Sequence, residues 1–258
     1  NNRIGRLQRV EVGLNQGHST FGKTPEQLSE TPLATPPPYV DFDLWLGPAP
    51  ARKFTPKIHH PMQWRYNLEY SCGMLTDFAA HQLDIMQWAL NKDGIEPVAI
   101  ENIKGRLPPF TDLYNTLAEP FSFEIVYGDG MRVFVSSSYA YGCRFHGENG
   151  KQIYVTNGKI ETNPPELVRE KIGEDEVRLI RSGQQEKNFI EAVYSGATPI
   201  SPVQAGFSAL VPAVLAHIGM RTERASLKWQ AEKTRFENAP DADKLLAPHM
   251  RAPWRLDV

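Results

Sequence analysis

The sequence predicts an α+β fold, an open and largely antiparallel or mixed β-sheet with helices packed on one face. Three observations support it: helical periodicity over residues 74–90, alternation of apolar and polar residues over 98–155, and renewed helical periodicity after residue 184. The 258 residues include 41% hydrophobic and 22% charged residues, enough apolar content to bury a core. We therefore expect one domain spanning residues 1–258.

The first strand is expected over residues 5–14, where apolar and polar residues alternate. A long Pro-rich loop follows at 15–43, because "TPLATPPPYV" favours extended backbone. The apolar positions of "MLTDFAAHQLDIMQWAL" recur at helical spacing over 74–90. Ser71 is available to cap the start of this helix and Gly94 to end it.

Residues 98–182 are expected to contribute most of the strands. "GDG" at 128–130 and "TNGK" at 156–159 are typical of tight hairpin turns between such strands. Helices are expected within 184–224, packed with the 74–90 helix on the same face of the sheet. An antiparallel sheet covered on one side leaves its other face free.

Composition excludes several classes of protein. A formal net charge of -2 offers no basic surface for nucleic acid or an anionic membrane. No continuous apolar run approaches the ~18 residues of a membrane span. Cys72 and Cys143 are the only cysteines, so neither a disulfide framework nor an all-cysteine metal site can form, and a single bridge between them remains open.

Three titratable residues follow one another at steps of four and three in the 74–90 helix: Asp77, His81 and Asp84. Residues four apart on a helix are neighbours, so the Asp77 carboxylate can reach the His81 imidazole. A carboxylate beside an imidazole fixes its tautomer and raises its basicity, as general acid-base catalysis requires. The simpler alternative is an ion pair on the helix surface.

The segment "HHPMQWRY" just upstream supplies candidates for substrate binding. Arg65 could hold hydroxyl or carboxylate groups with its fork of donors, and Trp64 and His60 could line the same pocket. His59 and His60 are adjacent and point in different directions, so at most one should approach His81. We expect no metal site, since one would need a histidine of this segment to converge on the helix.

The other candidates are assigned structural roles. Tyr139 and Tyr141 alternate along an expected strand and should pack on one face. His146, His217 and His249 have no carboxylate at helical spacing.

Four runs of the sequence resemble the C-terminal domain of the Gfo/Idh/MocA oxidoreductases, close to the sugar-associated bacterial branch. They are "DFDLWLGPAP", "WRYNLEYSCGMLTDFAAHQLDIMQWAL", "NFIEAVYSGATPISPVQAGFSAL" and "KWQAEKTRFENAPDADKLLAPHMRAPWRL". The resemblance implies a dihydrodipicolinate-reductase-like sheet, Asp77 and His81 as the functional pair, and Asp84 as a structural partner in the same helix, which we also count among the substrate-binding residues. The chain departs from the family pattern at Cys72 and Ala79, where glycine is usual, and at Phe207, where histidine is common.

The resemblance further implies an NAD(P)-dependent oxidoreductase that converts an alcohol of a sugar, sugar derivative or cyclitol into a ketone. The family's NAD or NADP is bound mainly by a preceding Rossmann domain, and neither its G-x-G-x-x-G turn nor its E-K-P motif occurs here. We therefore expect this chain to be the second domain of a longer enzyme, which forms a homo-oligomer through the free face of the sheet. An NAD-assisted or metal-assisted keto-sugar lyase or glycosidase, and a non-catalytic oligomerisation or carbohydrate-binding module, remain alternatives. The compartment stays open between the cytoplasm and an exported location.

Overall fold

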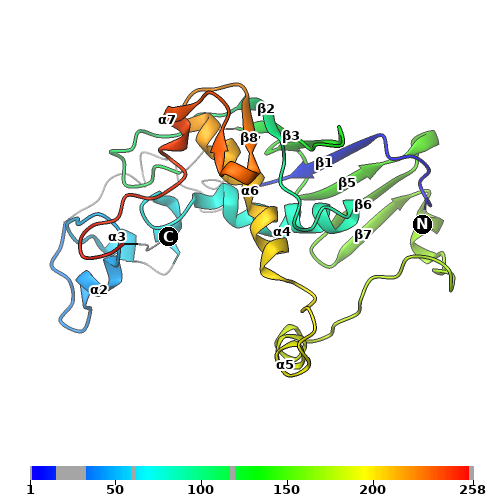
Figure 1. Ribbon diagram of the computed structural model, residues 1–258, viewed down its shortest axis with the longest axis horizontal. Coiled ribbons are helices and arrows are strands. Elements are labelled where there is room, and N and C mark those ends of the chain that lie inside the picture. The colour runs from blue at the N-terminus through cyan, green and yellow to red at the C-terminus, as the bar shows by residue number, and fades with distance from the viewer. Residues whose placement is uncertain (1, 16–32, 60–61, 117–119, 256–258) are drawn as a thin grey trace.

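The computed structural model describes residues 2–15, 33–59, 62–116 and 120–255. Within them, nine strands form one sheet in the order β7-β6-β5-β1-β4-β3-β2-β8-β9 (Figure 1). The strands are β1 (Arg9–Gly13), β2 (Ala99–Lys104), β3 (Ser122–Val126), β4 (Arg132–Ser136), β5 (Gly142–His146), β6 (Gln152–Thr156), β7 (Lys159–Asn163), β8 (Leu227–Gln230) and β9 (Arg235–Phe236). The helices are α2 (Phe42–Leu46), α3 (Pro56–His59), α4 (Gly73–Leu90), α5 (Gln185–Ser195), α6 (Val203–Arg221) and α7 (Pro240–Asp243).

The sheet is mixed and largely antiparallel, as predicted. β1 runs parallel to β4 and antiparallel to β5, and the other neighbouring pairs are antiparallel. Hairpins form at both predicted turns, between β3 and β4 and between β6 and β7. Six of the nine described strands, β2 to β7, come from residues 98–182, which confirms that this region supplies most of the sheet.

One face of the sheet carries the apolar core. Val12 of β1 lies opposite Val135 of β4 and Cys143 of β5, and Val135 in turn lies opposite Phe123 of β3. All four side chains are buried, whereas the side chains of Glu11, Glu124, Phe134 and Arg144, which alternate with the buried positions, are only partly buried. This period-two burial is the alternation that the sequence shows.

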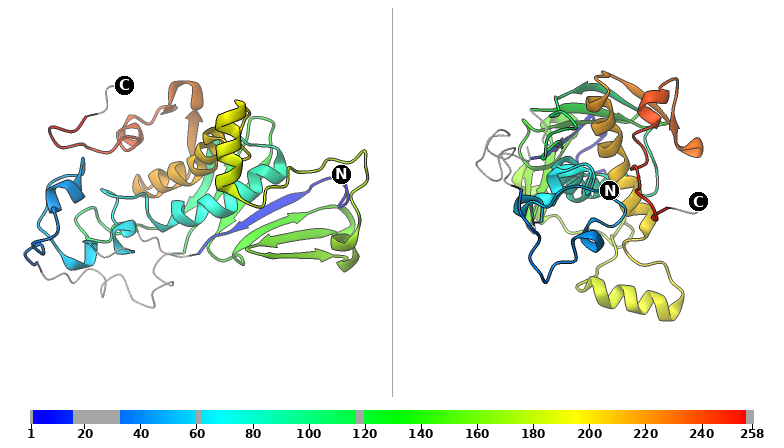
Figure 2. Two further views of the ribbon diagram at one scale, coloured as in Figure 1. Left: turned by 90° about the horizontal axis from the view of Figure 1, so that it is seen from below. Right: turned by 90° about the vertical axis from the view of Figure 1, so that its left-hand side faces the viewer.

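Helices α4 and α6 pack side by side on this apolar face (Figure 2). Cys143 of β5 donates its thiol hydrogen to the Gln82 carbonyl of α4 at 3.0 Å. Ser208 of α6 donates to Gln87 Oε1 at 2.9 Å, and Gln87 Nε2 donates to the Ser208 carbonyl at 2.8 Å. These buried hydrogen bonds fix the two helices to each other and to the sheet. The packing of both helices on one face of the sheet is the arrangement that the sequence predicted.

Helix α5 does not follow that prediction. It projects from the body of the molecule on two extended arms, and none of its residues is buried (Figures 1 and 2). Its apolar side chains face solvent among the described residues, including Phe189 and Tyr194, which is 88% exposed. The expectation that all helices of 184–224 pack on the sheet is therefore wrong for α5.

Helix α6 is long and apolar enough to cross a membrane, by length and composition alone. Two-thirds of its most apolar window, 67%, is buried inside the protein. A core helix passes the same test, so this finding is weak evidence for a membrane span. Polar residues interrupt its apolar sequence at Ser208 and His217, both of which are buried.

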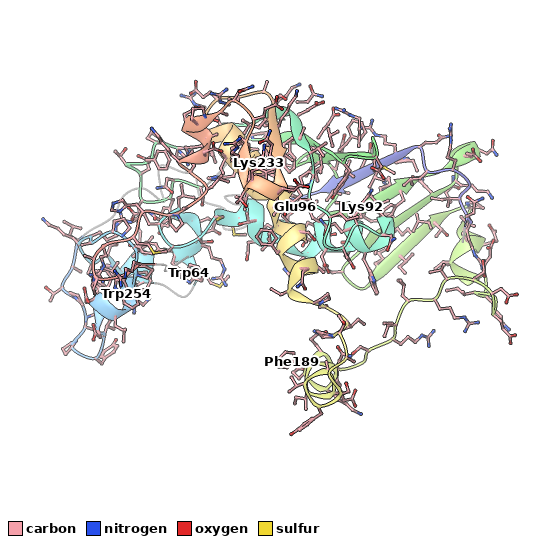
Figure 3. The ribbon with its side chains drawn as sticks, in the orientation of Figure 1. Trp64, Lys92, Glu96, Phe189, Lys233 and Trp254 are labelled. Carbon is pink, nitrogen blue, oxygen red and sulfur yellow. The ribbon has the colours of Figure 1, made fainter. Side chains whose placement is uncertain are left out.

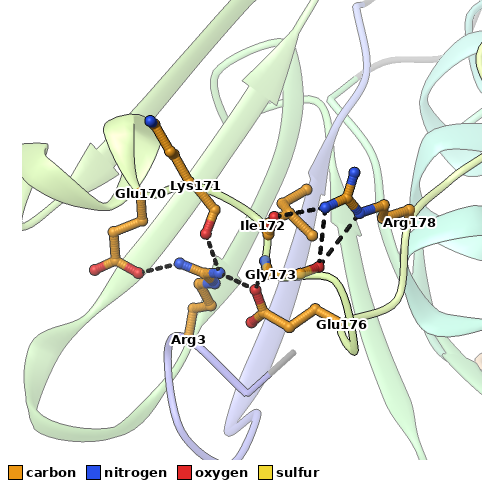
Figure 4. A network of polar contacts seen from close by, with 7 residues as sticks. All are labelled: Arg3, Glu170, Lys171, Ile172, Gly173, Glu176 and Arg178. Atoms are coloured by element: carbon orange, nitrogen blue, oxygen red, sulfur yellow. Dashed lines mark hydrogen bonds and ion pairs between the residues drawn. The ribbon is translucent and has the colours of Figure 1, made fainter.

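The N-terminal residues are fastened to the segment that leads from the sheet to α5. Arg3 pairs with Glu170 and Glu176, and its Nη2 donates to the Lys171 carbonyl at 2.8 Å (Figure 4). Arg178 donates to the carbonyl oxygens of Ile172 and Gly173 at 3.0 and 3.1 Å. These contacts close the turn before the arm extends towards α5.

The termini of α4 differ from the predicted ones. Ser71 Oγ accepts a hydrogen bond from the Gly73 backbone N–H at 3.2 Å, so Ser71 assists the start, but Cys72 occupies the N-cap position. Asn91, in the left-handed conformation, ends the helix in place of Gly94. Cys72 is exposed and Cys143 buried, and both are free thiols, so the open alternative of a bridge is excluded in this structure.

Candidate functional site on helix α4

The titratable residues of α4 lie on its outer face. Leu83 and Met86 on the opposite side are fully buried in the core, while Asp77, His81 and Asp84 are exposed. Steps of four and three residues return to the same side of a helix with 3.6 residues per turn, which places the three groups in one row. We call Asp77, His81 and Asp84 the α4 row.

Asp77 is directed to Arg65 rather than to His81. The distance from Arg65 Nε to Asp77 Oδ1 is 3.9 Å, and the Asp77 side chain is 47% exposed. Although both residues are described, no hydrogen bond or ion pair joins Asp77 to His81. The expected Asp77–His81 contact is therefore not formed, because the guanidinium group occupies the position beside the carboxylate.

Arg65 connects the α4 row to an aromatic side chain. Its guanidinium carbon lies 4.8 Å from the centre of the Trp64 ring, within the range of a cation–π contact. Both residues belong to the short 3-10 helix η2 (Gln63–Tyr66), which packs beside the N-terminal end of α4. The structure thus brings together Trp64, Arg65 and Asp77, which the sequence grouped by proximity alone.

The protein environment disfavours the charged form of Asp84. Desolvation by surrounding protein atoms raises the pKa of this carboxyl group, repulsion from Asp93 raises it further, and His81 offsets part of the effect. A carboxyl group whose charged form is disfavoured by the fold is a candidate for a functional role, because it does not stabilise the folded state. His81, one helical turn away from Asp84, is the imidazole nearest in sequence to this carboxyl group.

A close backbone approach fixes the entry to α4. Gly73 has a φ of +81°, and a β-carbon there would lie 2.5 Å from Thr116 Oγ1. The Thr116 N–H donates to the Tyr66 carbonyl at 3.1 Å, which holds the loop before β3 against η2. Asn67 Nδ2 donates to the Leu113 carbonyl at 2.7 Å and reinforces this contact. The glycine is required so that this loop, η2 and the start of α4 can meet.

The remaining histidine candidates behave differently. His60 lies outside the described residues. His59 packs between the rings of Trp45 and Phe54, with centroid distances of 5.8 and 5.5 Å. Across the described part of the chain, no group of three or more His, Cys, Asp or Glu side chains is arranged to hold a metal ion.

One cross-strand arrangement escaped the sequence analysis, and one prediction about tyrosines was wrong. His146 Nε2 lies 3.1 Å from Glu11 Oε2, because β1 and β5 are neighbours although 135 residues separate the pair.

Tyr139 and Tyr141 do not share a face, contrary to the prediction. Arg9 donates to the Tyr139 hydroxyl, whereas the Tyr141 ring packs edge-on against Phe78 of α4. The backbone turns between the two tyrosines, which cancels the alternation expected for a strand.

The sequence lacks the usual signature of a dinucleotide site. It has no G-x-G-x-x-G turn between a strand and a helix. The long helices α4 and α6 are preceded by loops, and their N-caps, Cys72 and Pro202, make no side-chain capping hydrogen bond. That this chain alone does not bind NAD or NADP stays a prediction, which rests on the missing Gly-rich turn.

The family profile described as "Oxidoreductase family, C-terminal alpha/beta domain" of the Gfo/Idh/MocA group matches residues 12–256. The chain belongs to this family. As a Gfo/Idh/MocA C-terminal domain, it has the mixed open sheet and one-sided helical layer that the sequence predicted. No curated protein sequence matches the chain significantly.

Solved structures with a similar arrangement include an oxidoreductase from Thermotoga maritima, with 13% identity and a TM-score of 0.44 over 87% of this chain and 54% of that one. An aldose-aldose oxidoreductase from Caulobacter crescentus in complex with glycerol has 13% identity and a TM-score of 0.46, covering 88% of this chain and 57% of that one. An oxidoreductase from Agrobacterium radiobacter in complex with NAD+, L-tartaric acid and magnesium has 11% identity and a TM-score of 0.41, covering 88% and 58%. This Gfo/Idh/MocA chain thus spans little more than half the length of these proteins.

Proposed function

We propose that this chain is the substrate-binding and catalytic half of an NAD(P)-dependent oxidoreductase that converts an alcohol of a sugar, sugar derivative or cyclitol into a ketone. The observation that carries the proposal is the α4 row, exposed beside Arg65 on a domain of an oxidoreductase family. An exposed imidazole that interacts electrostatically with a neighbouring carboxyl group, as His81 does with Asp84, is suited to accept a proton from a hydroxyl group.

Each residue of the site has a role in this proposal. His81 accepts the hydroxyl proton, Asp84 stabilises the imidazolium that results, and Asp77 holds the Arg65 guanidinium group beside the site. Arg65 and Trp64 position the substrate, Arg65 by donating hydrogen bonds and Trp64 by contact with its ring. The nicotinamide supplies the hydride acceptor, and the dinucleotide is held by a separate domain that covers the exposed face of α4.

The proposal is tested in the complete enzyme by replacing His81. His81→Ala should lower turnover at saturating cofactor by about 10²- to 10⁴-fold, the usual contribution of a positioned general base. Asp77→Asn should lower turnover less, because Arg65 would lose its partner while the imidazole remains. Asp84→Asn should not lower stability, since the fold already disfavours the charged carboxylate. If His81→Ala keeps near-parent turnover, the site assignment is wrong.

The keto-sugar lyase or glycosidase alternative uses the same row, with transient oxidation before bond cleavage. It is distinguished by its product, a released sugar or aglycone instead of an accumulated ketone. A non-catalytic module is the outcome if no turnover depends on the row.

The open face of the sheet is proposed as the surface of a homo-oligomer. This face carries positively and negatively charged side chains next to one another. Arg132 lies 2.6 Å from Glu101 and 2.7 Å from Glu124, and Arg9 pairs with Glu11 at 2.7 Å. A face with both signs can pair with a copy of itself about a two-fold axis. Arg132→Glu should convert dimers to monomers in light scattering, and Lys187→Glu on α5 should not. A parent chain that is monomeric at micromolar concentration would contradict this assignment.

A further inference from the structure

An aromatic groove lies next to η2 and shares Trp64 with the site around the α4 row. It has a volume of about 310 Å³, at the lower end of the roughly 300–1,000 Å³ typical of small-molecule sites. Trp45 and Leu46 of α2 line it together with the turn that follows them, and Trp64 of η2 and the segment before α4 close it. Its lining residues are Trp45, Leu46, Pro48, Ala49, Trp64, Glu69 and Tyr70.

The aromatic wall of the groove is held in place by its own packing. The Trp45 ring stacks on Phe42 with centroids 5.7 Å apart and an interplanar angle of 19°, and it lies 5.1 Å from the Tyr70 ring. The side chain of Asp41 caps α2 by accepting from the Leu44 N–H at 3.0 Å. A groove whose walls are already ordered loses little entropy when a ligand enters.

The C-terminal segment braces the same wall from outside. Arg251 Nη1 pairs with Asp43 at 2.8 Å, and Arg251 Nε donates to the Gly47 carbonyl at 2.9 Å. The Arg251 N–H donates to the Pro48 carbonyl at 3.0 Å. The rim that bears Pro48 is therefore fixed to Arg251, about 200 positions away in the sequence, and Trp64, which is labelled in Figure 3, lines the same groove.

Polar groups lie along one edge of the aromatic surface. The exposed Glu69 carboxylate lies 3.2 Å from Arg52 Nη1, and the Arg52 guanidinium carbon lies 6.0 Å from the centre of the Tyr70 ring. Burial raises the pKa of Tyr70, and attraction to Arg52 offsets part of that rise. The groove thus combines two indole rings and a phenol ring with one carboxylate, and the Arg52 guanidinium group lies behind that carboxylate, outside the groove lining.

This combination fits the ring of a carbohydrate better than a purely apolar or a charged ligand. The face of an aromatic ring is electron-rich and attracts the weakly positive C–H groups on one side of a pyranose. The hydroxyl groups at the edge of that sugar can donate to the Glu69 carboxylate, which Arg52 holds in place. A hydrophobic peptide would remove water from the ion pair of Glu69 and Arg52 without supplying any hydrogen bond in its place.

The groove is connected to the α4 row through two adjacent residues. Trp64 lines the groove, and Arg65 stacks on Trp64 at 4.8 Å and approaches Asp77 at 3.9 Å. A ligand in the groove therefore lies next to the residues proposed to hold the reacting sugar. The geometry points to a second sugar subsite in this groove, so that the substrate is a glycoside or oligosaccharide with a non-reacting ring, not a free monosaccharide. This inference rests on the proposed function.

Calorimetric titration of the chain with cellobiose, maltose, lactose and glucose tests the groove. At least one disaccharide should bind at least about tenfold more tightly than glucose, because glucose cannot occupy both subsites. Trp64→Ala should weaken that binding by about tenfold, and Glu69→Gln, an exposed and nearly isosteric change, by about threefold. Tyr194→Ala, which removes an exposed aromatic ring from α5, should leave it unchanged.

The inference is overturned if no disaccharide binds better than glucose, or if neither Trp64→Ala nor Glu69→Gln weakens binding beyond the Tyr194→Ala control. The two proposals fail separately. If His81→Ala loses turnover but no disaccharide binds selectively, only the sugar subsite in the groove is refuted. If a disaccharide binds selectively but His81→Ala keeps full turnover, the catalytic role of the α4 row is refuted.

Discussion

The substitution Gly73→Ala tests how the entry to α4 is built. Gly73 has a φ of +81°, a conformation that costs a residue with a β-carbon roughly 1–2 kcal/mol. Alanine also restricts the unfolded chain, which returns about 0.4–1 kcal/mol. The new β-carbon would meet Thr116, at 2.5 Å from its Oγ1, and such overpacking costs about 1–3 kcal/mol.

Gly130→Ala is the matched control for this change. Gly130 has a φ of +85°, and among the described residues no heavy atom outside its immediate neighbours lies within 4 Å of an added β-carbon. The backbone costs of the two substitutions are therefore nearly equal and cancel. The free energy of unfolding of Gly73→Ala should then lie about 1–3 kcal/mol below that of Gly130→Ala, the contact with Thr116 alone.

Urea unfolding of the parent and both variants measures this difference. Repeating the pair in a Thr116→Gly background removes the contacting side chain, so the difference should shrink towards zero. Equal destabilisation of the two alanine variants, within about 0.5 kcal/mol, would refute the contact between the loop and the helix entry. A difference that persists without Thr116 would assign the cost to another part of the entry.

Two other predictions concern pH and cofactor. Burial, with repulsion from Arg221, lowers the pKa of His217 to about 3 from 6.5. The unfolded chain therefore binds a proton there that the folded chain does not, and stability should fall as pH drops from about 6.5 towards 3, by up to about 1.4 kcal/mol per pH unit. In the His217→Gln variant, the free energy of unfolding measured with urea should fall less between pH 7.5 and pH 5 than in the parent. An equal fall in both proteins would count against the burial of His217. The 258-residue chain should bind neither NAD nor NADP in calorimetry, since it lacks a Gly-rich turn at a helix N-terminus, and sub-millimolar binding of either would contradict this.

The fold class was predictable because it depends on local periodicity. The alternation of residues in β3, β4 and β5 indicates which side of each strand is buried, and the 3.6-residue period of α4 indicates the buried side of that helix. A sheet covered by helices on one face requires this burial on one side. The same periodicity placed the α4 row on one face of its helix. It could not show that this face is exposed, because exposure depends on what packs there.

Helix α5 illustrates the limit of the same reasoning. Its sequence is amphipathic, and an amphipathic helix is normally assigned to the nearest core. In the structure its apolar side chains, such as Phe189, cover nothing among the described residues, because the arms on either side carry it away from the sheet. A helical pattern predicts that one face is apolar and does not name the surface that covers it.

The sequence by itself determined the long helix α4, the strands of residues 98–182, the one-sided sheet and the alignment of Asp77, His81 and Asp84. Only the tertiary structure decided that Asp77 meets Arg65, that Glu11 meets His146, and that Trp45 and Tyr70 form a groove with Trp64. The physical reason is the range of the interactions. Positions within one helix or strand are fixed by backbone geometry over a few residues, whereas contacts between elements depend on how the whole chain packs.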